Sequence, residues 1–322
     1  MKIINLPLIL LALTLVSCSS NVIKDYEENL LFINNINGCV ESILSETFEA
    51  EDKFGEIQKG DPATPNFYLP INSIISGNSF YEFTKQGKLK TIKNESKYYS
   101  YRSTFDYDDS GNIVEQNYEY DDTKPVYRED GKVLKGPHIT KFKIEKDKIV
   151  SSITYDEEGE KYRTSDIVFE GDLIKEIVSK DEKGTLINKI KYSYENGIQT
   201  QSLYNKEGKL TQQYKRDIDG RTLESYLSYS DKKTQFIYKE GIVFPVEIKI
   251  YEDNDISGKM YLSFDEKHNI TEIKEIDEDG EIDTKYSFTY KFDDNGNWIE
   301  QATYEDEELE YITTRNIEYY KN

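Results

Sequence analysis

Acidic side chains in short polar turns are the most numerous residues of this sequence that could do chemistry. Asp106, Asp108 and Ser110 stand at alternate positions before Gly111, as oxygen ligands do in the first half of an EF-hand calcium loop. Such a loop ends in a bidentate Glu, but Asn117 occupies that place here. An Asp that begins a turn also accepts hydrogen bonds from the turn backbone. We therefore predict turns at these acids and no bound metal.

Catalytic constellations are hard to find among the remaining polar residues. His138 and His268 lie outside any H-E-x-x-H or G-x-S-x-G pattern. Ser230 to Lys233 matches S-x-x-K, but it lies in a predicted hairpin turn rather than at the start of a buried helix. Paired carboxylates could hydrolyse glycosides, yet among 62 acidic residues the spacing selects no pair. We predict no catalytic residues and no cofactor, so we do not expect an enzyme.

The first residues carry a targeting signal. Lys2 precedes an apolar run from Ile3 to Val16, which is typical of a cleaved signal peptide and short for a membrane span. We assign residues 1–17 to this peptide.

Leu15, Val16, Ser17 and Cys18 end the apolar run and resemble the lipobox of bacterial lipoproteins. The resemblance implies that the chain is cut before Cys18 and that this cysteine is acylated, which would hold the protein on a membrane. Residues 18–38 would then be the lipidated cysteine and a tether, and Cys39 would be the one remaining thiol, expected as a small buried residue. We expect a location in the bacterial cell envelope, on the outer membrane, facing the periplasm or the cell surface.

The overall charge limits the possible partners. The chain has a formal net charge of -21, and such a surface repels nucleic-acid phosphates and anionic lipid headgroups. We therefore expect no nucleic acid. Contact with the membrane would come from the acyl chains on Cys18.

Internal repetition is the main structural signal of residues 39–322. Gly159, Gly171, Gly184, Gly197, Gly208 and Gly220 follow polar clusters at steps of 11 to 13 residues, which is the length of one strand and one turn. The turns share an aromatic residue, an Asp or Asn, two polar residues and a Gly, as in Tyr107 to Gly111, Tyr155 to Gly159 and Phe292 to Gly296.

The segments before these turns alternate strictly. Tyr286, Phe288, Tyr290 and Phe292 fall on one face of a strand, and polar residues fall between them. The pattern predicts an all-β fold, an antiparallel up-and-down sheet of roughly twenty strands in repeated hairpins that is twisted or curled. Residues 124–138 break the rhythm and are a possible seam. The pattern leaves open whether the sheet stays open, folds into two layers or closes, and the 32% of charged residues disfavours a membrane-spanning barrel.

The turn motif resembles the tyrosine-aspartate (YD) repeats of rearrangement-hotspot (RHS) proteins and of repeat-bearing lipoproteins in Bacteroidetes-type bacteria. Tyr107-Asp108, Tyr155-Asp156 and Phe292-Asp293, each followed by its Gly, carry this likeness. The resemblance implies a long sheet built of hairpins that twists or curls.

These observations favour a non-catalytic, lipid-anchored envelope protein whose repeat surface binds or scaffolds another protein. Tyr286, Tyr290 and Trp298 form the candidate binding surface, because tyrosine provides contact area at low entropic cost. One alternative is an envelope protein that binds or processes glycans through exposed tyrosines and paired acidic side chains. Another is an immunity or antitoxin-like partner of a basic toxin, which the negative charge would complement.

Overall fold

Strands and short turns make up the described part of the protein. The computed structural model describes residues 36–54, 56–63, 78–95, 100–120, 126–127, 133–134, 138–242 and 244–321. The predicted signal peptide, the lipobox and Cys18 lie outside these residues. In the part of the chain that the structure describes, no helix is long and apolar enough to cross a membrane.

The strands follow one another at short intervals along the chain. They are β1 (Val40–Lys53), β2 (Glu56–Pro62), β3 (Asn78–Phe83), β4 (Leu89–Glu95), β5 (Ser100–Tyr107), β6 (Ile113–Tyr120), β7 (Val126–Tyr127), β8 (Val133–Leu134), β9 (His138–Glu145), β10 (Lys148–Tyr155), β11 (Lys161–Glu170), β12 (Leu173–Asp181), β13 (Leu186–Glu195), β14 (Ile198–Asn205), β15 (Leu210–Arg216), β16 (Thr222–Leu227), β17 (Lys232–Tyr238), β18 (Pro245–Glu252), β19 (Asp255–Phe264), β20 (Ile270–Ile276), β21 (Ile282–Phe292), β22 (Trp298–Glu305) and β23 (Glu308–Tyr319).

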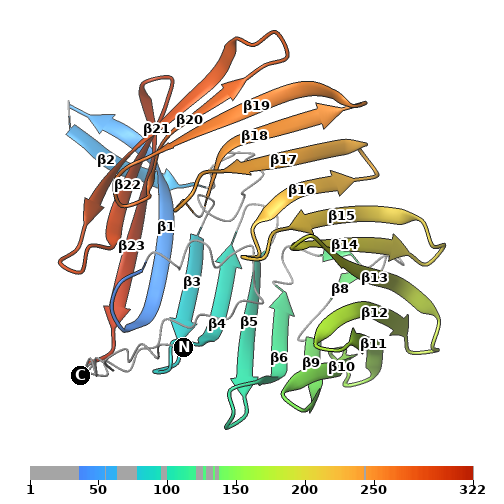
Figure 1. Ribbon diagram of the computed structural model, residues 1–322. Helices are drawn as coiled ribbons and strands as arrows, with labels where there is room; N and C mark the ends of the chain where they lie inside the picture. The colour runs from blue at the N-terminus through green and yellow to red at the C-terminus, as the bar shows by residue number, and fades with distance from the viewer. Residues whose placement is uncertain are drawn as a thin grey trace, which may run out of the picture.

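The strands close into one antiparallel ring. From β3 to β6 and from β9 to β23 each strand pairs with the next, β6 pairs with β9, and β1 joins β23 to β3. Twenty of the described strands belong to this ring, while β2 pairs with β1 outside it and β7 pairs with β8. Figure 1 shows the strands following one another around the ring. The predicted up-and-down antiparallel sheet is confirmed, and the structure shows that it closes into a barrel.

Nine turns of the described chain share one hydrogen-bonding pattern, and residues 293–297 illustrate it. The amide of Asp293 donates to the carbonyl of Asn297, and the amide of Gly296 donates back to the carbonyl of Asp293. The Asp293 carboxylate accepts hydrogen bonds from the amides of Asn295 and Asn297 at 3.0 and 2.9 Å. Gly296 has a φ of 81°, which a side chain would disfavour. The predicted turn role is confirmed for Asp108, which has the same bonding pattern, whereas Asp106 lies within β5.

Tyrosines near the ends of some strands hydrogen-bond to the first residue of the preceding strand. The hydroxyl of Tyr107 donates to the carbonyl of Leu89 at 2.6 Å, and the hydroxyl of Tyr238 donates to the carbonyl of Thr222 at 2.9 Å. These carbonyls lie just after a turn, where a β-bulge interrupts the ladder. The aromatic residue of the repeat thus has a structural function, because it satisfies a carbonyl that the bulge exposes.

The barrel wall has two chemically different faces. One face carries the buried side chains, including Ile248 and Ile273, both 0% exposed. Side chains converge on the concave side of a curved wall and splay apart on the convex side, so this apolar and aromatic face points inward. The outward face carries Lys and Glu side chains that pair across neighbouring strands, as Lys215 and Glu224 do at 2.8 Å.

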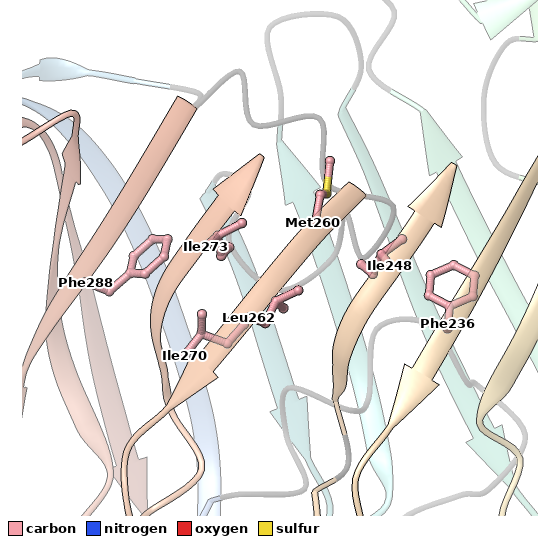
Figure 2. Packing of buried hydrophobic residues seen from close by; sticks show 7 residues of the cluster. All are labelled: Phe236, Ile248, Met260, Leu262, Ile270, Ile273 and Phe288. Carbon is pink, nitrogen blue, oxygen red and sulfur yellow. The ribbon is translucent and has the colours of Figure 1, made fainter. Parts of the chain in front are cut away.

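The buried residues form two separate clusters on the inward face. The first consists of Phe236, Ile248, Met260, Leu262, Ile270, Ile273 and Phe288. Figure 2 shows these residues on the adjacent strands β17 to β21, with strands of the N-terminal half passing behind them. The second cluster, from β1, β3, β4 and β5, consists of Ile43, Tyr81, Phe83, Leu89, Ile92 and Phe105. Among the described strands, the close backbone contacts join only sheet neighbours.

The up-and-down order gives the barrel two distinct ends. The described chain begins at Ile36 beside the turn 293–297, and we call this the proximal end. The turns 253–254, 277–281 and 306–307 lie at the opposite, distal end, as does the turn between β1 and β2. The hairpin β1–β2 projects from the ring there, because β1 pairs with β23 only as far as Glu49.

Candidate functional site

The structure places the three predicted binding residues on the inward face of neighbouring strands. Tyr290 on β21 lies 5.9 Å from Trp298 on β22, centroid to centroid. Its hydroxyl donates to the carbonyl of Ile270 at 2.6 Å and accepts from the side chain of Gln301 at 3.0 Å. Burial raises the pKa of Tyr290. Tyr286 packs against the first buried cluster. The polar atom of Tyr290 is therefore already used within the wall.

The Trp298 ring also contacts the guanidinium of a buried arginine, Arg315, which the sequence pattern does not predict. The guanidinium carbon of Arg315 on β23 lies 3.2 Å from the centroid of the Trp298 ring. Arg315 is 6% exposed, and its burial lowers the pKa of the guanidinium. Stacking on an aromatic face offers a desolvated guanidinium a favourable contact. The only tryptophan of the chain thus supports an inward-facing arginine.

Asn297 joins the start of the described chain to the turn 293–297. Its side chain accepts from the amide of Asn37 at 2.7 Å and donates to the Asn37 carbonyl at 2.8 Å. It also donates to the hydroxyl of Tyr319 at 2.7 Å, and that hydroxyl donates to the Asp293 carboxylate. This polar cluster, which we call the proximal clasp, fixes both ends of the described chain at one end of the barrel.

A row of five rings on the inward face was not singled out by sequence reasoning. Tyr101 and Tyr118 stack with centroids 5.2 Å apart and planes 13° apart. Tyr120, His138 and Tyr162 continue the row at 4.8, 6.2 and 5.8 Å. It crosses from β5 through β6 and β9 to β11. The strict alternation of tyrosines in Tyr118 and Tyr120 is the sequence signal that could have identified it.

Acidic residues crowd the distal end of β20 to β23. Burial raises the pKa of Glu305, and the neighbouring Glu310 and Asp306 raise it further. Burial also raises the pKa of Glu275, with Asp283 and Glu305 adding to the effect. The like charges make ionisation of each of these partly buried carboxylic acids more costly.

Other candidates from the sequence are placed as follows. Ser230 lies in the turn between β16 and β17, and the exposed His268 lies in the turn before β20. His138 is buried at the start of β9. Within the described ranges, no three His, Cys, Asp or Glu side chains gather in a way that could hold a metal.

Cys39 differs from the expectation of a free thiol, because it is a disulfide cysteine in the structure. The only other cysteine of the chain is Cys18. A disulfide at Cys18 and its acylation exclude each other, since both use the same sulfur.

The charge of the outward face determines whether the barrel wall could contact lipid. Ion pairs such as Lys189–Glu176 at 3.3 Å and Lys291–Glu300 at 2.6 Å recur around it. A barrel that spans a bilayer instead presents an apolar band to the lipid, and charges there are costly. The described wall therefore suits an aqueous environment.

Comparison with solved structures finds several proteins at low similarity. A porin-like protein from Bacteroides uniformis has 10% sequence identity and a TM-score of 0.33 over 88% of this chain and 98% of that chain. A porin-like protein from Bacteroides vulgatus has 12% identity and a TM-score of 0.27 over 72% and 98%. The Photorhabdus luminescens Tc holotoxin pore has 11% identity and a TM-score of 0.24 over 74% of this chain and 15% of that chain.

No family model and no curated protein matches the sequence. The TM-scores are too low to support conclusions about function, and the fold assignment stands on the strand pairing within this chain. The likeness to YD and RHS repeats stays a prediction.

Proposed function

We propose that the protein is a non-catalytic, lipid-anchored protein of the bacterial cell envelope whose barrel binds another envelope protein. The observation that carries this proposal is the charged outward face, which suits a barrel held beside a membrane rather than within it. The lipobox residues Leu15 to Cys18 supply the anchor. A chain from Cys18 to Ile36 can reach at most about 60 Å, so the proximal end stays near the bilayer.

The experiment for the anchor uses the full chain in its native envelope. Metabolic labelling with an alkyne-bearing fatty acid should tag the protein, and Cys18→Ala should abolish the tag and release the barrel from the membrane fraction. A matched Cys39→Ala variant should keep the tag. An untagged protein whose mass shows Cys18 joined to Cys39 by a disulfide would refute the anchor.

The experiment for the partner is chemical cross-linking in intact envelopes followed by mass spectrometry. A single protein partner should cross-link to the anchored protein, and Cys18→Ala should lose it. Recovery of the protein without any partner, in both the parent and the variant, would contradict protein binding.

The ring row of Tyr101, Tyr118 and Tyr120 favours a second candidate, a carbohydrate-binding envelope protein. Aromatic side chains offer apolar surface with polar tips to a sugar. Against this, Tyr101 and Tyr118 stack on each other, which covers one face of each ring. A glycan array probed with the purified barrel and with Tyr118→Ala tests the idea, because binding that is unchanged in the variant would remove this site from consideration.

A further inference from the structure

The hairpin β1–β2 ends in an aromatic residue that nothing described covers. Phe54 stands at the tip with an exposed fraction of 107%. Ile57, on β2, is 56% exposed and pairs with Asp52 across the hairpin. Burial of a phenylalanine side chain in a protein interior or interface is stabilising, and Phe54 forgoes this contribution within the barrel.

The backbone at Phe54 adds a second cost. Its φ of 63° is left-handed, and it is the only apolar residue with a positive φ among the described residues. Lys53 pairs with Glu56, so the loop has two residues, and the favoured turns of that length call for Asn, Asp or Gly at such a position. The other two-residue turns place polar residues or glycine at their positive-φ positions, as in Asn196-Gly197 and Asp253-Asn254, and also in Lys146-Asp147 and Asp306-Glu307. A local conflict of this kind, without a compensating contact in the fold, points to function.

The base of the hairpin is firmly held, so the tip is presented in a fixed direction. The ammonium of Lys59 donates to the hydroxyl of Thr314 at 3.1 Å and lies 4.7 Å from the Phe48 ring centroid. The amide of Ala63 donates to the carbonyl of Thr47 at 2.8 Å. A rigid hairpin loses little entropy when its tip is bound.

The charges around the hairpin select the class of partner. Glu49, Glu51, Asp52, Glu56 and Asp61 outnumber the two lysines Lys53 and Lys59 on this segment. The acids around the β22–β23 turn lie next to the hairpin, because Glu49 pairs with Tyr311 on β23. The negative charges of Glu49, Glu305 and Glu310 all raise the pKa of Tyr311. Such a surface attracts a cationic partner and repels both anionic lipid headgroups and a second copy of this chain.

We propose that the β1–β2 hairpin is a docking site for a basic protein, with Phe54 entering an apolar pocket of that protein. The proposal rests on the proposed protein-binding function and adds the surface and the charge of the partner. It places docking at the distal end, opposite the proximal clasp and the tether.

The first test is site-specific photo-cross-linking in intact cells with a benzophenone-bearing phenylalanine at position 54. The same probe at Ile218, which is 87% exposed in a turn at the proximal end, is the matched control. We expect one basic protein, identified by mass spectrometry, to cross-link from position 54 and not from position 218. Adducts with lipid, with a second copy of this chain, or equally from both positions would overturn the proposal.

The second test measures binding of that purified partner to the full chain and to Phe54→Asn. Asparagine tolerates a positive φ, so the variant should melt no lower than the parent while its affinity falls at least about 10-fold. Higher salt should weaken binding of the parent. Equal affinity of the two chains would refute the role of Phe54, and stronger binding of the parent to phosphatidylethanolamine–phosphatidylglycerol vesicles would assign the tip to a membrane. Neither result touches the acylation test of Cys18, so the two proposals can fail separately.

Discussion

His268 provides a direct test of the turn geometry, since it occupies a position that other copies of the turn give to glycine. Its amide donates to the carbonyl of Asp265 at 3.0 Å, as the Gly296 amide does to Asp293, and its φ is 64°. The His268 side chain is exposed, so its removal loses little packing. We predict that His268→Gly stabilises the barrel.

The magnitude follows from two opposing terms. A left-handed backbone costs a residue with a Cβ about 1–2 kcal/mol, and His268→Gly removes this cost. Glycine also has more conformational freedom in the unfolded chain, which lowers the free energy of unfolding by about 0.4–1 kcal/mol. The expected net gain in the free energy of unfolding is about 0.5–1 kcal/mol, which for a chain of this length raises the melting temperature by about 1–2 °C.

The assay is thermal unfolding followed by circular dichroism, with a reciprocal control. Gly280 has a φ of 88°, and a Cβ there would meet nothing within 4 Å. Gly280→His should therefore lower the melting temperature by a similar amount, and the double variant should melt close to the parent. A lower melting temperature for His268→Gly would show that the imidazole makes a stabilising contact and would refute this account of the turn.

Three further outcomes are expected. Burial and neighbouring acids raise the pKa of Glu305 in the folded state, so its ionisation destabilises the barrel as pH rises through that raised pKa. Glu305→Gln should therefore raise the melting temperature at pH 7.5 and have little effect below the pKa of an unfolded Glu, near 4. Asn297→Ala should lower the free energy of unfolding by about 1–3 kcal/mol, because it removes three hydrogen bonds of the proximal clasp; hydrogen exchange should show faster opening at Asn37 and in β23, and unchanged exchange would contradict the clasp. Tyr290→Phe should cost about 1–2 kcal/mol in urea unfolding, since the Ile270 carbonyl and the Gln301 amide lose a shared partner, whereas Tyr261→Phe, at an exposed outward position, should be neutral.

The local structure could be predicted from the sequence because its signals are short-ranged. The alternation in residues 286–292 and the Asp and Gly of the turns depend only on neighbouring residues, and the structure has strands and turns at these places. Closure of the ring could not be predicted, because the pairing of β1 with β23 joins residues such as Ile43 and Ile317. No local pattern specifies which distant strand completes a sheet.

The candidate site was harder to predict for a related reason. Exposed aromatics and wall aromatics look alike in an alternating sequence, so Tyr290 was a reasonable binding candidate until its hydroxyl was found bonded to Ile270. The stacking of Arg315 on Trp298 depends on the register between β22 and β23. Phe54 carries no motif at all. Its significance comes from its φ and its exposure, which only coordinates provide.

The closure of the ring by β1 has a consequence for how the chain reaches its native state. Every pairing from β3 through β23 joins strands that are adjacent or nearly adjacent in the chain, so most of the wall can assemble progressively from local hairpins. The contact of β1 with β23 spans almost the whole polypeptide and must wait until the last strand has been made. Until then one edge of β1 and the growing edge of the sheet lack partners, and exposed edges invite association with other chains. We therefore expect assembly of this barrel to depend on keeping its first strand protected until synthesis of the chain is complete.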